Sequence, residues 1–414
     1  MILEKYSWGI GDRFAHQGEA QLKAIIEAQK LGLEITPVWN KSNREHTIVH
    51  SSPEGTRKEA DNAVKALGWK GSYRVDADHI NLSTVDNFID NSDFFTLDVA
   101  DYIGKKANDE SIKKFIEKSK AYEGKLSIPG IAEAFDVTPS LIQAIAEKFC
   151  YAIEEAHKIY KKIEASKGKD NFITEVSMDE VDQPQTPVEL FFILCGLAQV
   201  GVPLQTIAPK FTGRFNKGVD YRGDIPQFSK EFEEDVLVID FAVKEFGLAE
   251  NLKLSIHSGS DKFSIYPIMG QIIKKYNKGI HVKTAGTTWL EEVIGLAVAG
   301  GKGLDVAKEI YCNAYGRMDE LCGPYATVID IHKKNLPAPE TVKAWDSKKF
   351  ANSLRHIPDD PDYNSDLRQL IHVGYKVAAE LGNRYTDELV NNKEIVGQCV
   401  TENLLERHIK RLFV

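Results

Sequence analysis

Eight short segments rich in β-branched and aromatic residues recur along the chain, and each ends in polar residues before a stretch of helical character. They span residues 6–12, 34–40, 72–78, 94–100, 172–177, 204–211, 253–258 and 280–286. Strands that alternate with helices predict a parallel sheet. Eight such units, apolar where they begin and polar where they end, favour a closed (β/α)8 barrel of the TIM type, which gathers functional groups at the carboxyl ends of its strands.

The structural rival is a doubly wound open sheet. In its dinucleotide-binding form, such a sheet carries the spacing GxGxxG directly after the first strand. The first strand here leads into GIGDRFAHQGEAQ, which lacks that spacing. We therefore predict an α/β barrel over residues 1–300.

Two regions interrupt or follow this pattern. Residues 109–125, 131–149 and 152–167 have apolar residues at helical spacing, so we interpret residues 102–170 as a helical insertion after the fourth strand. Residues 301–414 are predicted as a helical C-terminal extension packed on the barrel. Whether this extension caps the barrel or joins a second subunit in a homo-oligomer is left open.

Composition restricts the class of partner. The net charge is −9 and no concentrated basic stretch is present, which argues against nucleic acid and favours a small molecule. The longest apolar run, residues 190–204, is shorter than the roughly 20 residues that cross a bilayer, so we expect a buried helix and no membrane partner. Five cysteines without a CxxC pair, and no secretion signal, predict a cytoplasmic protein with reduced thiols.

The third predicted strand ends in YRVDADHI, which crowds acidic residues and a histidine at one exit. Strand alternation predicts Val75, Ala77 and His79 on the face that fills the barrel, so His79 would reach the mouth as a metal ligand. A histidine bonded to a loop carbonyl is the simpler alternative. Asp78 is equally ambiguous, because an aspartate at a strand end often caps the next helix.

Other exits strengthen the metal interpretation. His257 ends the seventh strand, and Glu175 lies near the end of the fifth. Imidazole nitrogens and carboxylate oxygens bind Zn²⁺, Mn²⁺ or Co²⁺, and three protein ligands leave a position open for substrate. His281 lies on the same face of the eighth strand as Lys283, but early in that strand, where a packed core histidine is equally expected.

Further polar residues at the exits suit a substrate with hydroxyl and carboxylate groups. Lys210 and Arg214 follow the sixth strand as a carboxylate clamp or as part of a solvated loop. Asp12 and Gln17 follow the first strand, where Asp12 would alternatively cap a helix. Since no GxSxG, GxxxxGK[ST] or HExxH motif is present, the remaining chemistry is metal-assisted proton transfer on a small polar molecule.

The segments VDADHI, FFTLDVAD, HSGSDKFSIYP, HVKTAGTTWLEE and ENLLERHIKRLF resemble the tagaturonate epimerase family over most of the chain. This resemblance implies an isomerase of hexuronate catabolism that interconverts D-tagaturonate and D-fructuronate with a divalent cation such as Zn²⁺, Mn²⁺, Co²⁺ or Ni²⁺. The two ketoses differ at the carbon β to the ketone, which simple enolisation does not invert. Retro-aldol cleavage, rotation of the aldehyde and re-formation of the bond invert it.

The resemblance also implies roles for individual residues. The metal ligands would be His79, His257 and His281, with Asp78, or its neighbour Asp76, as proton acceptor and Glu175 as proton donor. Apart from the resemblance, the polar strand exits themselves predict the substrate-binding residues Asp12, Gln17, Lys210, Arg214, Ser258, Asp261, Lys262 and Lys283. The alternatives are a metal-dependent aldolase or an epimerase acting on another keto-sugar or sugar acid, and a barrel that binds a sugar acid without catalysis.

Overall fold

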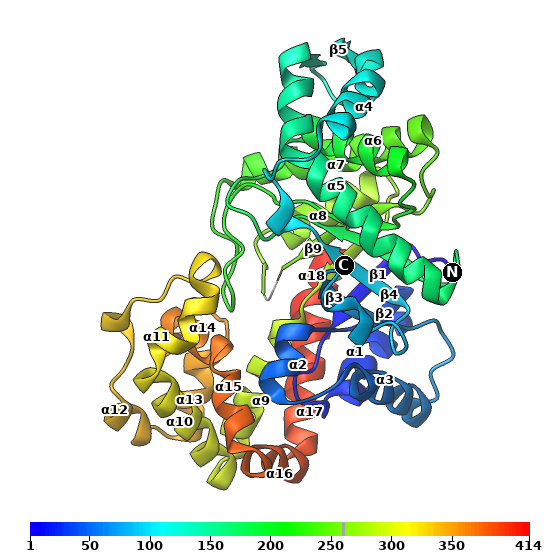
Figure 1. Ribbon diagram of the computed structural model, residues 1–414. Helices are drawn as coiled ribbons and strands as arrows, with labels where there is room; N and C mark the ends of the chain where they lie inside the picture. The colour runs from blue at the N-terminus through cyan, green and yellow to red at the C-terminus, as the bar shows by residue number, and fades with distance from the viewer. Residues whose placement is uncertain (259–260) are drawn as a thin grey trace.

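The computed structural model describes residues 1–258 and 261–414. Eight parallel strands form a closed barrel in the order β1-β10-β9-β8-β7-β4-β3-β2 (Figure 1). The strands are β1 (Tyr6–Ile10), β2 (Ile35–Ser42), β3 (Arg74–Ile80), β4 (Phe94–Asp98), β7 (Ile173–Ser177), β8 (Thr206–Ala208), β9 (Lys253–His257) and β10 (Ile280–Lys283). All eight lie within or across the predicted segments, so the barrel prediction is confirmed.

Helices surround the barrel and join its strands. They are α1 (Gly18–Lys30), α2 (Asn43–Val49), α3 (Pro53–Leu67), α5 (Pro139–Lys167), α6 (Pro187–Val200), α7 (Ile225–Phe246), α8 (Tyr266–Lys275) and α9 (Ala285–Ala299). The apolar run at residues 190–204 forms most of α6, whose start carries a reciprocal capping box between Thr186 and Glu189. Within the described ranges, no helix is long and apolar enough to span a membrane.

The insertion after β4 is only partly helical. It contains α4 (Asp109–Ser119), the antiparallel pair β5 (Gly124–Leu126) and β6 (Phe135–Val137), and then α5, and it projects from one side of the barrel in Figure 1. The helix predicted from residue 131 is wrong over residues 131–138. Its start is fixed instead by Thr138, whose hydroxyl accepts a hydrogen bond from the Leu141 amide, with Pro139 at the first helical position.

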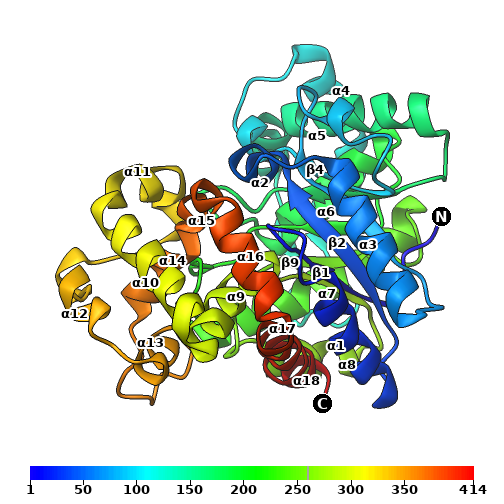
Figure 2. The same ribbon diagram turned by 90° about the horizontal axis from the view of Figure 1, so that it is seen from below.

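The C-terminal extension is helical. It comprises α10 (Gly301–Gly316), α11 (Met318–Cys322), α12 (Pro339–Lys343), α13 (Ser347–Leu354), α14 (Ser365–Val373), α15 (Tyr375–Leu381), α16 (Asn383–Asn391), α17 (Lys393–Glu402), a π-helical turn (Asn403–Ile409) and α18 (Lys410–Phe413). Helices α10 to α16 share a hydrophobic core with α9 and form a lobe beside the barrel (Figure 2). The last helices run back along the barrel, where α17 packs on α1 and α18 on α8.

The inside of the barrel is largely polar. A small apolar layer of Leu3, Val38, Phe94 and Ile173 closes its floor, whereas the main core lies between the strands and the outer helices. Above this floor lie buried polar side chains, namely Ser7, Thr36, Asn40, Asp76, Thr96, Glu175, Thr206, Ser255, His281 and Lys283. Such an interior tolerates charged groups only when they are paired, and this requirement organises the site.

Candidate active site

Lys283 on β10 is the centre of a charge cluster inside the barrel. Its Nζ donates hydrogen bonds to Asp76 Oδ2 at 2.8 Å, to Asp78 Oδ1 at 2.9 Å and to Thr96 Oγ1 at 2.6 Å. It also forms an ion pair with Glu175 Oε1 at 2.9 Å. These partners come from β3, β4 and β7, so the contacts are possible only across the barrel interior. Sequence analysis named Lys283 as substrate-binding, but its ammonium is surrounded by protein carboxylates.

A glycine on the neighbouring strand makes room for this lysine. Gly9 on β1 pairs with Lys283 in the parallel register. A Cβ added at Gly9 would lie 2.8 Å from Lys283 Cγ, which is closer than van der Waals contact allows. Any side chain at this position would therefore displace the stem of Lys283 and with it the centre of the cluster.

The two aspartates of β3 differ in their electrostatics. Burial raises the pKa of Asp76 to about 7, against the opposing effect of the Lys283 ammonium. Burial also acts to raise the pKa of Asp78, but Lys283 and His79 together hold it below its ordinary value. Asp78 is therefore a carboxylate at neutral pH, and its 7% exposure against 1% for Asp76 leaves it nearer to the mouth.

The prediction that Val75, Ala77 and His79 share the interior face of β3 is wrong. Asp76 and Asp78 reach Lys283 inside the barrel, whereas Val75 and Ala77 belong to the hydrophobic core between the barrel strands and the outer helices. The pairing of β3 with β4 shifts register between Ala77 and Ile80, and His79 has a left-handed φ of 50°. This bulge carries His79 to the mouth, and an unfavourable backbone of this kind is common at functional sites.

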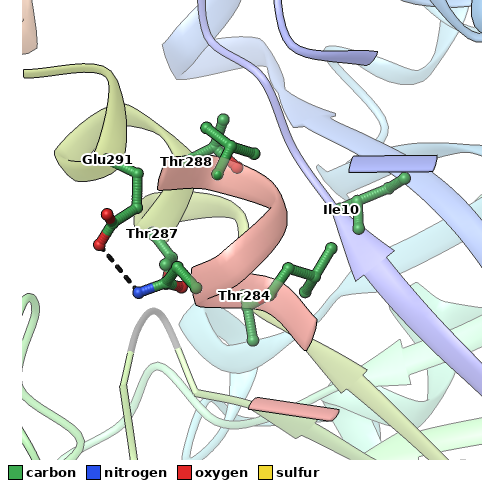
Figure 3. Close-up of a pocket in the computed structure, with 8 residues that line it drawn as sticks. Ile10, Thr284, Thr287, Thr288 and Glu291 are labelled. Carbon is green, nitrogen blue, oxygen red and sulfur yellow. Dashed lines mark hydrogen bonds between the residues drawn. The ribbon is translucent and has the colours of Figure 1, made fainter. Parts of the chain in front are cut away.

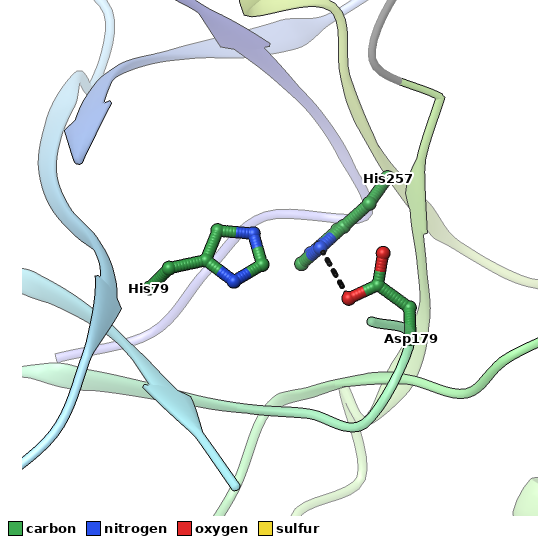
Figure 4. Close-up of side chains that lie close together, drawn as sticks. All are labelled: His79, Asp179 and His257. Carbon is green, nitrogen blue, oxygen red and sulfur yellow. Dashed lines mark ion pairs between the residues drawn. The ribbon is translucent and has the colours of Figure 1, made fainter. Parts of the chain in front are cut away.

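Three side chains at the mouth, His79, Asp179 and His257, have the composition of a metal site. We call them the metal-type group. The ligand atoms of His79, Asp179 and His257 all lie within 4.8 Å of one another. Figure 4 shows His79 facing His257 and Asp179 from the opposite side of the mouth. His257 Nδ1 lies 3.2 Å from Asp179 Oδ1, and the two imidazole rings are 5.0 Å apart between centroids.

Outer carboxylates orient both imidazoles. His79 Nδ1 lies 3.1 Å from Asp98 Oδ2, which leaves Nε2 directed to the group. His257 Nε2 lies 2.7 Å from Glu175 Oε1, which leaves Nδ1 on the side of Asp179. A carboxylate on the far nitrogen of each ring is the usual second contact of a metal-binding histidine, because it fixes the tautomer and the ring orientation.

Glu175 is fully buried and lies among several donors. Its Oε1 is close to Lys283, His257 and Thr96, and its Oε2 accepts from Thr206 Oγ1 at 2.7 Å. Although burial opposes ionisation, Lys283 and His257 hold the pKa of Glu175 well below its usual value. These contacts give Glu175 the role of a fixed carboxylate behind His257, and they offer no support for the predicted role of proton donor.

A pocket opens beside the metal-type group. It is lined by Asp179, Pro209, Lys210, Phe211, Phe215, Ile256 and His257. Lys210 is half-buried, and within residues 1–258 and 261–414 its ammonium has no ion pair. A cation and aromatic rings next to a metal-type group suit a polar ligand that carries a carboxylate. The carboxylate clamp of Lys210 and Arg214 stays a prediction, and of the two only Lys210 is among the residues that line this pocket.

The structure places the other predicted residues outside this group. Asp12 accepts hydrogen bonds from the backbone of residues 14–17, so it holds the loop before α1 and does not cap that helix, whose N-cap is Gln17. The buried Gln17 side chain bonds to Glu292. Arg214 is exposed and donates to the Ile329 carbonyl at 3.3 Å, and Ser258 donates to the Lys283 carbonyl at 2.7 Å.

The predicted metal ligand His281 lies deeper in the barrel. It is fully buried, its Nδ1 lies 2.9 Å from Ser7 Oγ, and its ring packs on Phe94 at 5.3 Å. Burial lowers its pKa to about 3, so the ring is neutral. It does not belong to the group of ligand atoms at the mouth, and its position is that of the core histidine considered as the alternative.

Asp261 and Lys262 are also fully buried, and protein groups bind both. Asp261 contacts three side chains of the C-terminal extension, and Lys262 donates to the backbone of the loop after β8. Their predicted role in substrate binding therefore lacks support from these contacts.

Sequence reasoning missed three residues of the site. Asp179 follows β7 by two residues, and Thr96 and Asp98 lie on β4. Asp98 and Asp179 belong to polar strand exits that the sequence shows, whereas Thr96 lies in the middle of its strand. An aspartate in a loop has no periodicity that reveals where it points. The positions of the exits were the available signal, and they did not single out these side chains.

Comparison with known proteins agrees on one family. A protein-family model described as tagaturonate epimerase matches residues 1–412. The tagaturonate/fructuronate epimerase of Thermotoga maritima is 26% identical over 421 residues, which cover 98% of this chain and 80% of that protein.

Crystal structures of the fructuronate-tagaturonate epimerase of Cohnella laeviribosi show the same fold. The form with one glycerol aligns with a TM-score of 0.82 and the native form with 0.81, each at 23% identity over 99% of this chain and 81% of theirs. The barrel and its helical extension thus have solved counterparts.

Proposed function

Because this chain belongs to the tagaturonate epimerase family, we propose that it is an epimerase that interconverts D-tagaturonate and D-fructuronate. The observation that carries the proposal is the group of His79, Asp179 and His257 at the mouth of the barrel, next to the carboxylate of Asp78 and the cation of Lys210. This arrangement joins a metal-type site, a base and a partner for a sugar-acid carboxylate.

The donor set fits a divalent cation. Two imidazole nitrogens and one carboxylate oxygen are ligands that Zn²⁺, Mn²⁺, Co²⁺ and Ni²⁺ accept, and three protein ligands leave positions for substrate. We assign His79 Nε2, His257 Nδ1 and a carboxylate oxygen of Asp179 as the ligands, because Asp98 and Glu175 occupy the far nitrogens of the two rings. A bound divalent cation supplies Lewis acidity, which polarises a carbonyl oxygen and stabilises negative charge.

The residues of this chain supply the proton transfer. The stereocentre to be inverted is β to the ketone, so the reaction breaks and re-forms a carbon–carbon bond. We assign Asp78 as the acceptor of the hydroxyl proton, since it is ionised and lies with Oδ1 3.9 Å from His79 Nε2. As the proton leaves, the electrons of the O–H bond form the carbonyl bond of the aldehyde. The electrons of the broken carbon–carbon bond form the enediolate. Rotation of the aldehyde and return of the proton complete the inversion.

Lys283 takes no covalent part in this scheme. Aldol chemistry also proceeds through a Schiff base, which requires a neutral lysine amine. Although burial opposes the charge, Asp76, Asp78 and Glu175 raise the pKa of Lys283 well above its ordinary value. The amine is therefore held as an ammonium, and this supports the metal-assisted route.

Lys210 is assigned to the substrate carboxylate. Its ammonium lies in the pocket that also contains the metal-type residues Asp179 and His257. Phe211 and Phe215 line the same pocket and suit the carbon skeleton of the sugar acid.

The test is turnover of D-tagaturonate followed by NMR. The protein is stripped of metal and then resupplied with Mn²⁺, Co²⁺, Ni²⁺ or Zn²⁺ in turn. We expect D-fructuronate with conserved total ketose, and only when metal is present. Free aldehyde would identify an aldolase instead, and the absence of reaction with every metal would overturn the proposal.

A further inference from the structure

A second charged cluster joins the loop after β9 to the C-terminal extension. Asp261 is fully buried, and its Oδ2 accepts a hydrogen bond from Arg368 Nη2 at 2.7 Å and lies 3.0 Å from His356 Nδ1. Its Oδ1 lies 3.0 Å from His408 Nε2. The three partners stand 95, 107 and 147 positions further along the chain. We call Asp261, His356, Arg368 and His408 the clasp.

The donors of the clasp are themselves fixed. His408 Nδ1 lies 2.9 Å from Tyr266 Oη, so the hydroxyl donates to one ring nitrogen while the other donates to Asp261. Burial lowers the pKa of His408, which keeps the ring neutral and consistent with this chain of hydrogen bonds. His408 stands in the π-helical turn 403–409, and such turns recur at functional sites.

Neighbouring contacts hold the same C-terminal turn against the barrel. Asn403 Nδ2 donates to Glu291 Oε1 at 2.8 Å, across the small pocket of Figure 3 that Thr284 and Thr287 also line. The Arg407 guanidinium lies 4.9 Å from the ring centroid of Phe263. The turn is thus joined to α9 and to the segment after β9.

The clasp reaches the substrate pocket through the loop after β8. Arg368 Nε donates to the Gly218 carbonyl at 2.6 Å. Lys262, next to Asp261, donates to the carbonyls of Asn216 at 3.0 Å and Val219 at 2.8 Å. This loop, residues 209–224, has no regular secondary structure apart from a bridge between Arg214 and Arg222.

The same loop forms one wall of the pocket beside the metal-type group. Lys210, Phe211 and Phe215 line that pocket together with His257 and Asp179. An irregular loop keeps one conformation only where tertiary contacts determine it. Arg368 and Lys262 bind the carbonyls of residues 216, 218 and 219, and the Lys217 amide donates to the Val328 carbonyl at 2.8 Å. Asp261 is the carboxylate partner of that arginine.

We propose that Asp261 and Arg368 are positioning residues, which hold the loop 209–224 so that Lys210 and the two phenylalanines face the substrate. Asp261 and Lys262 then serve the reaction without touching the substrate, contrary to the binding role predicted from the sequence. The C-terminal turn that carries His408 becomes part of the same machinery.

Electrostatics explains why the clasp is sensitive to small changes. Arg368 is fully buried, and removal of the Asp261 charge takes away the ion pair of its guanidinium with Asp261 in a place away from water. Arg368 then either moves or draws in water, and in both cases it releases the Gly218 carbonyl. An amide of the same shape, as in Asp261→Asn, is enough to cause this release.

The experiment compares Asp261→Asn with Asp235→Asn. Asp235 is also buried, but it lies on α7, and among the described residues its Oδ1 has no hydrogen-bond partner. Burial raises its pKa well above the usual value, which favours its neutral form. Hydrogen exchange of residues 211–222 is measured first, because it needs no substrate. We expect faster exchange there in Asp261→Asn and wild-type exchange in Asp235→Asn. Unchanged exchange in Asp261→Asn would overturn the proposal.

The second readout rests on the proposed function and uses D-tagaturonate. We expect Asp261→Asn to raise KM by about 10- to 100-fold, as for a misplaced binding group, with metal affinity within about twofold of wild type. In the double variant with Lys210→Met, KM should rise by less than the product of the two single increases, because both changes act through the Lys210 side chain. Independent, multiplying effects would contradict the proposal. A wild-type protein without turnover would refute the proposed function alone.

His408→Gln is the milder variant should Asp261→Asn fold poorly. It removes a single donor of the clasp, and the amide of glutamine retains a donor and an acceptor. We expect faster hydrogen exchange of residues 211–222 and a higher KM, as in Asp261→Asn, but both changes should be smaller. Wild-type values in both readouts would separate the C-terminal turn from the site and contradict its place in the clasp.

Discussion

Lys283→Met removes the ammonium that pairs with three carboxylates inside the barrel. The wild-type Nζ lies 2.8 Å from Asp76, 2.9 Å from Asp78 and 2.9 Å from Glu175. At an effective dielectric constant of about 20, each pair is worth about 6 kcal/mol before the cost of desolvation. Much of this is offset by that cost, and the stranded carboxylates take up protons. We therefore expect the free energy of unfolding to fall by about 3–5 kcal/mol at neutral pH.

The loss should depend on pH in a defined direction. In the wild-type protein the pKa values of Asp78 and Glu175 are held low, so their contribution to stability is present above the unfolded pKa of about 4 and is lost as the pH falls through the folded pKa. Without Lys283, burial raises these pKa values above the unfolded value. The variant then takes up protons on folding. The difference between its free energy of unfolding and that of the wild-type protein should therefore shrink as the pH falls from 7.5 to 5.5.

Urea denaturation at these two pH values measures both effects. Lys253→Met is the matched control, because Lys253 is also buried in the barrel but donates to the carbonyls of Leu3 and Glu4 instead of to carboxylates. We expect the control to lose about 1 kcal/mol, the worth of an ordinary hydrogen bond. A loss below about 1 kcal/mol for Lys283→Met, or a deficit that grows at pH 5.5, would refute the argument.

Four further predictions follow from the same contacts. Asp98→Asn should weaken metal binding by about 10- to 100-fold by releasing His79, and isothermal titration with Zn²⁺ measures this; unchanged affinity would exclude His79 as a ligand. Asp78→Asn should bind metal normally and lose about 10²- to 10⁴-fold in turnover of tagaturonate, whereas near-normal turnover would remove Asp78 as the base. Borohydride added during turnover should leave the protein mass unchanged, since the Lys283 amine stays protonated; a trapped adduct would establish a Schiff base. Burial lowers the pKa of Lys253 to about 7, so the unfolded chain binds more protons than the folded chain above that pH. The free energy of unfolding should therefore rise from pH 7 to pH 9, and scanning calorimetry of Lys253→Met should show a weaker rise.

The sequence predicts the barrel because most of its strands are long enough to show their pattern. Seven of the eight strands are four residues or longer, and each is followed by a helix or a capped loop. The pair β5 and β6 has three residues per strand, too few for the alternation to stand out from the helical pattern of residues 131–149. Short strands of this kind form because of tertiary packing, and local propensity does not reveal them.

Which residues of β3 face the barrel interior was not predictable, because a bulge interrupts the alternation of the strand at His79. Alternation assigns Val75, Ala77 and His79 to one face, yet the interior side chains are Asp76 and Asp78, and His79 reaches the mouth through a left-handed backbone. An apolar residue on a barrel strand fits the outer face as well as the inner one, since helices cover the outside. The cation on β10 distinguishes the two faces, and its contact with β3 spans the barrel.

The same reasoning separates the residues that stabilise the fold from those that carry the reaction. The main core lies outside the strands, so the polar interior contributes little apolar packing and depends on the balance of Lys283 with its carboxylates. A change at Lys283 should therefore reduce stability first and turnover as a consequence. A change at Asp78, which is nearer to the mouth, should reduce turnover with a smaller loss of stability, because Lys283 keeps Asp76 and Glu175 as partners. If Asp78→Asn instead destabilised the protein as much as Lys283→Met, the cluster would be a structural ion-pair network, and the base would have to be sought elsewhere.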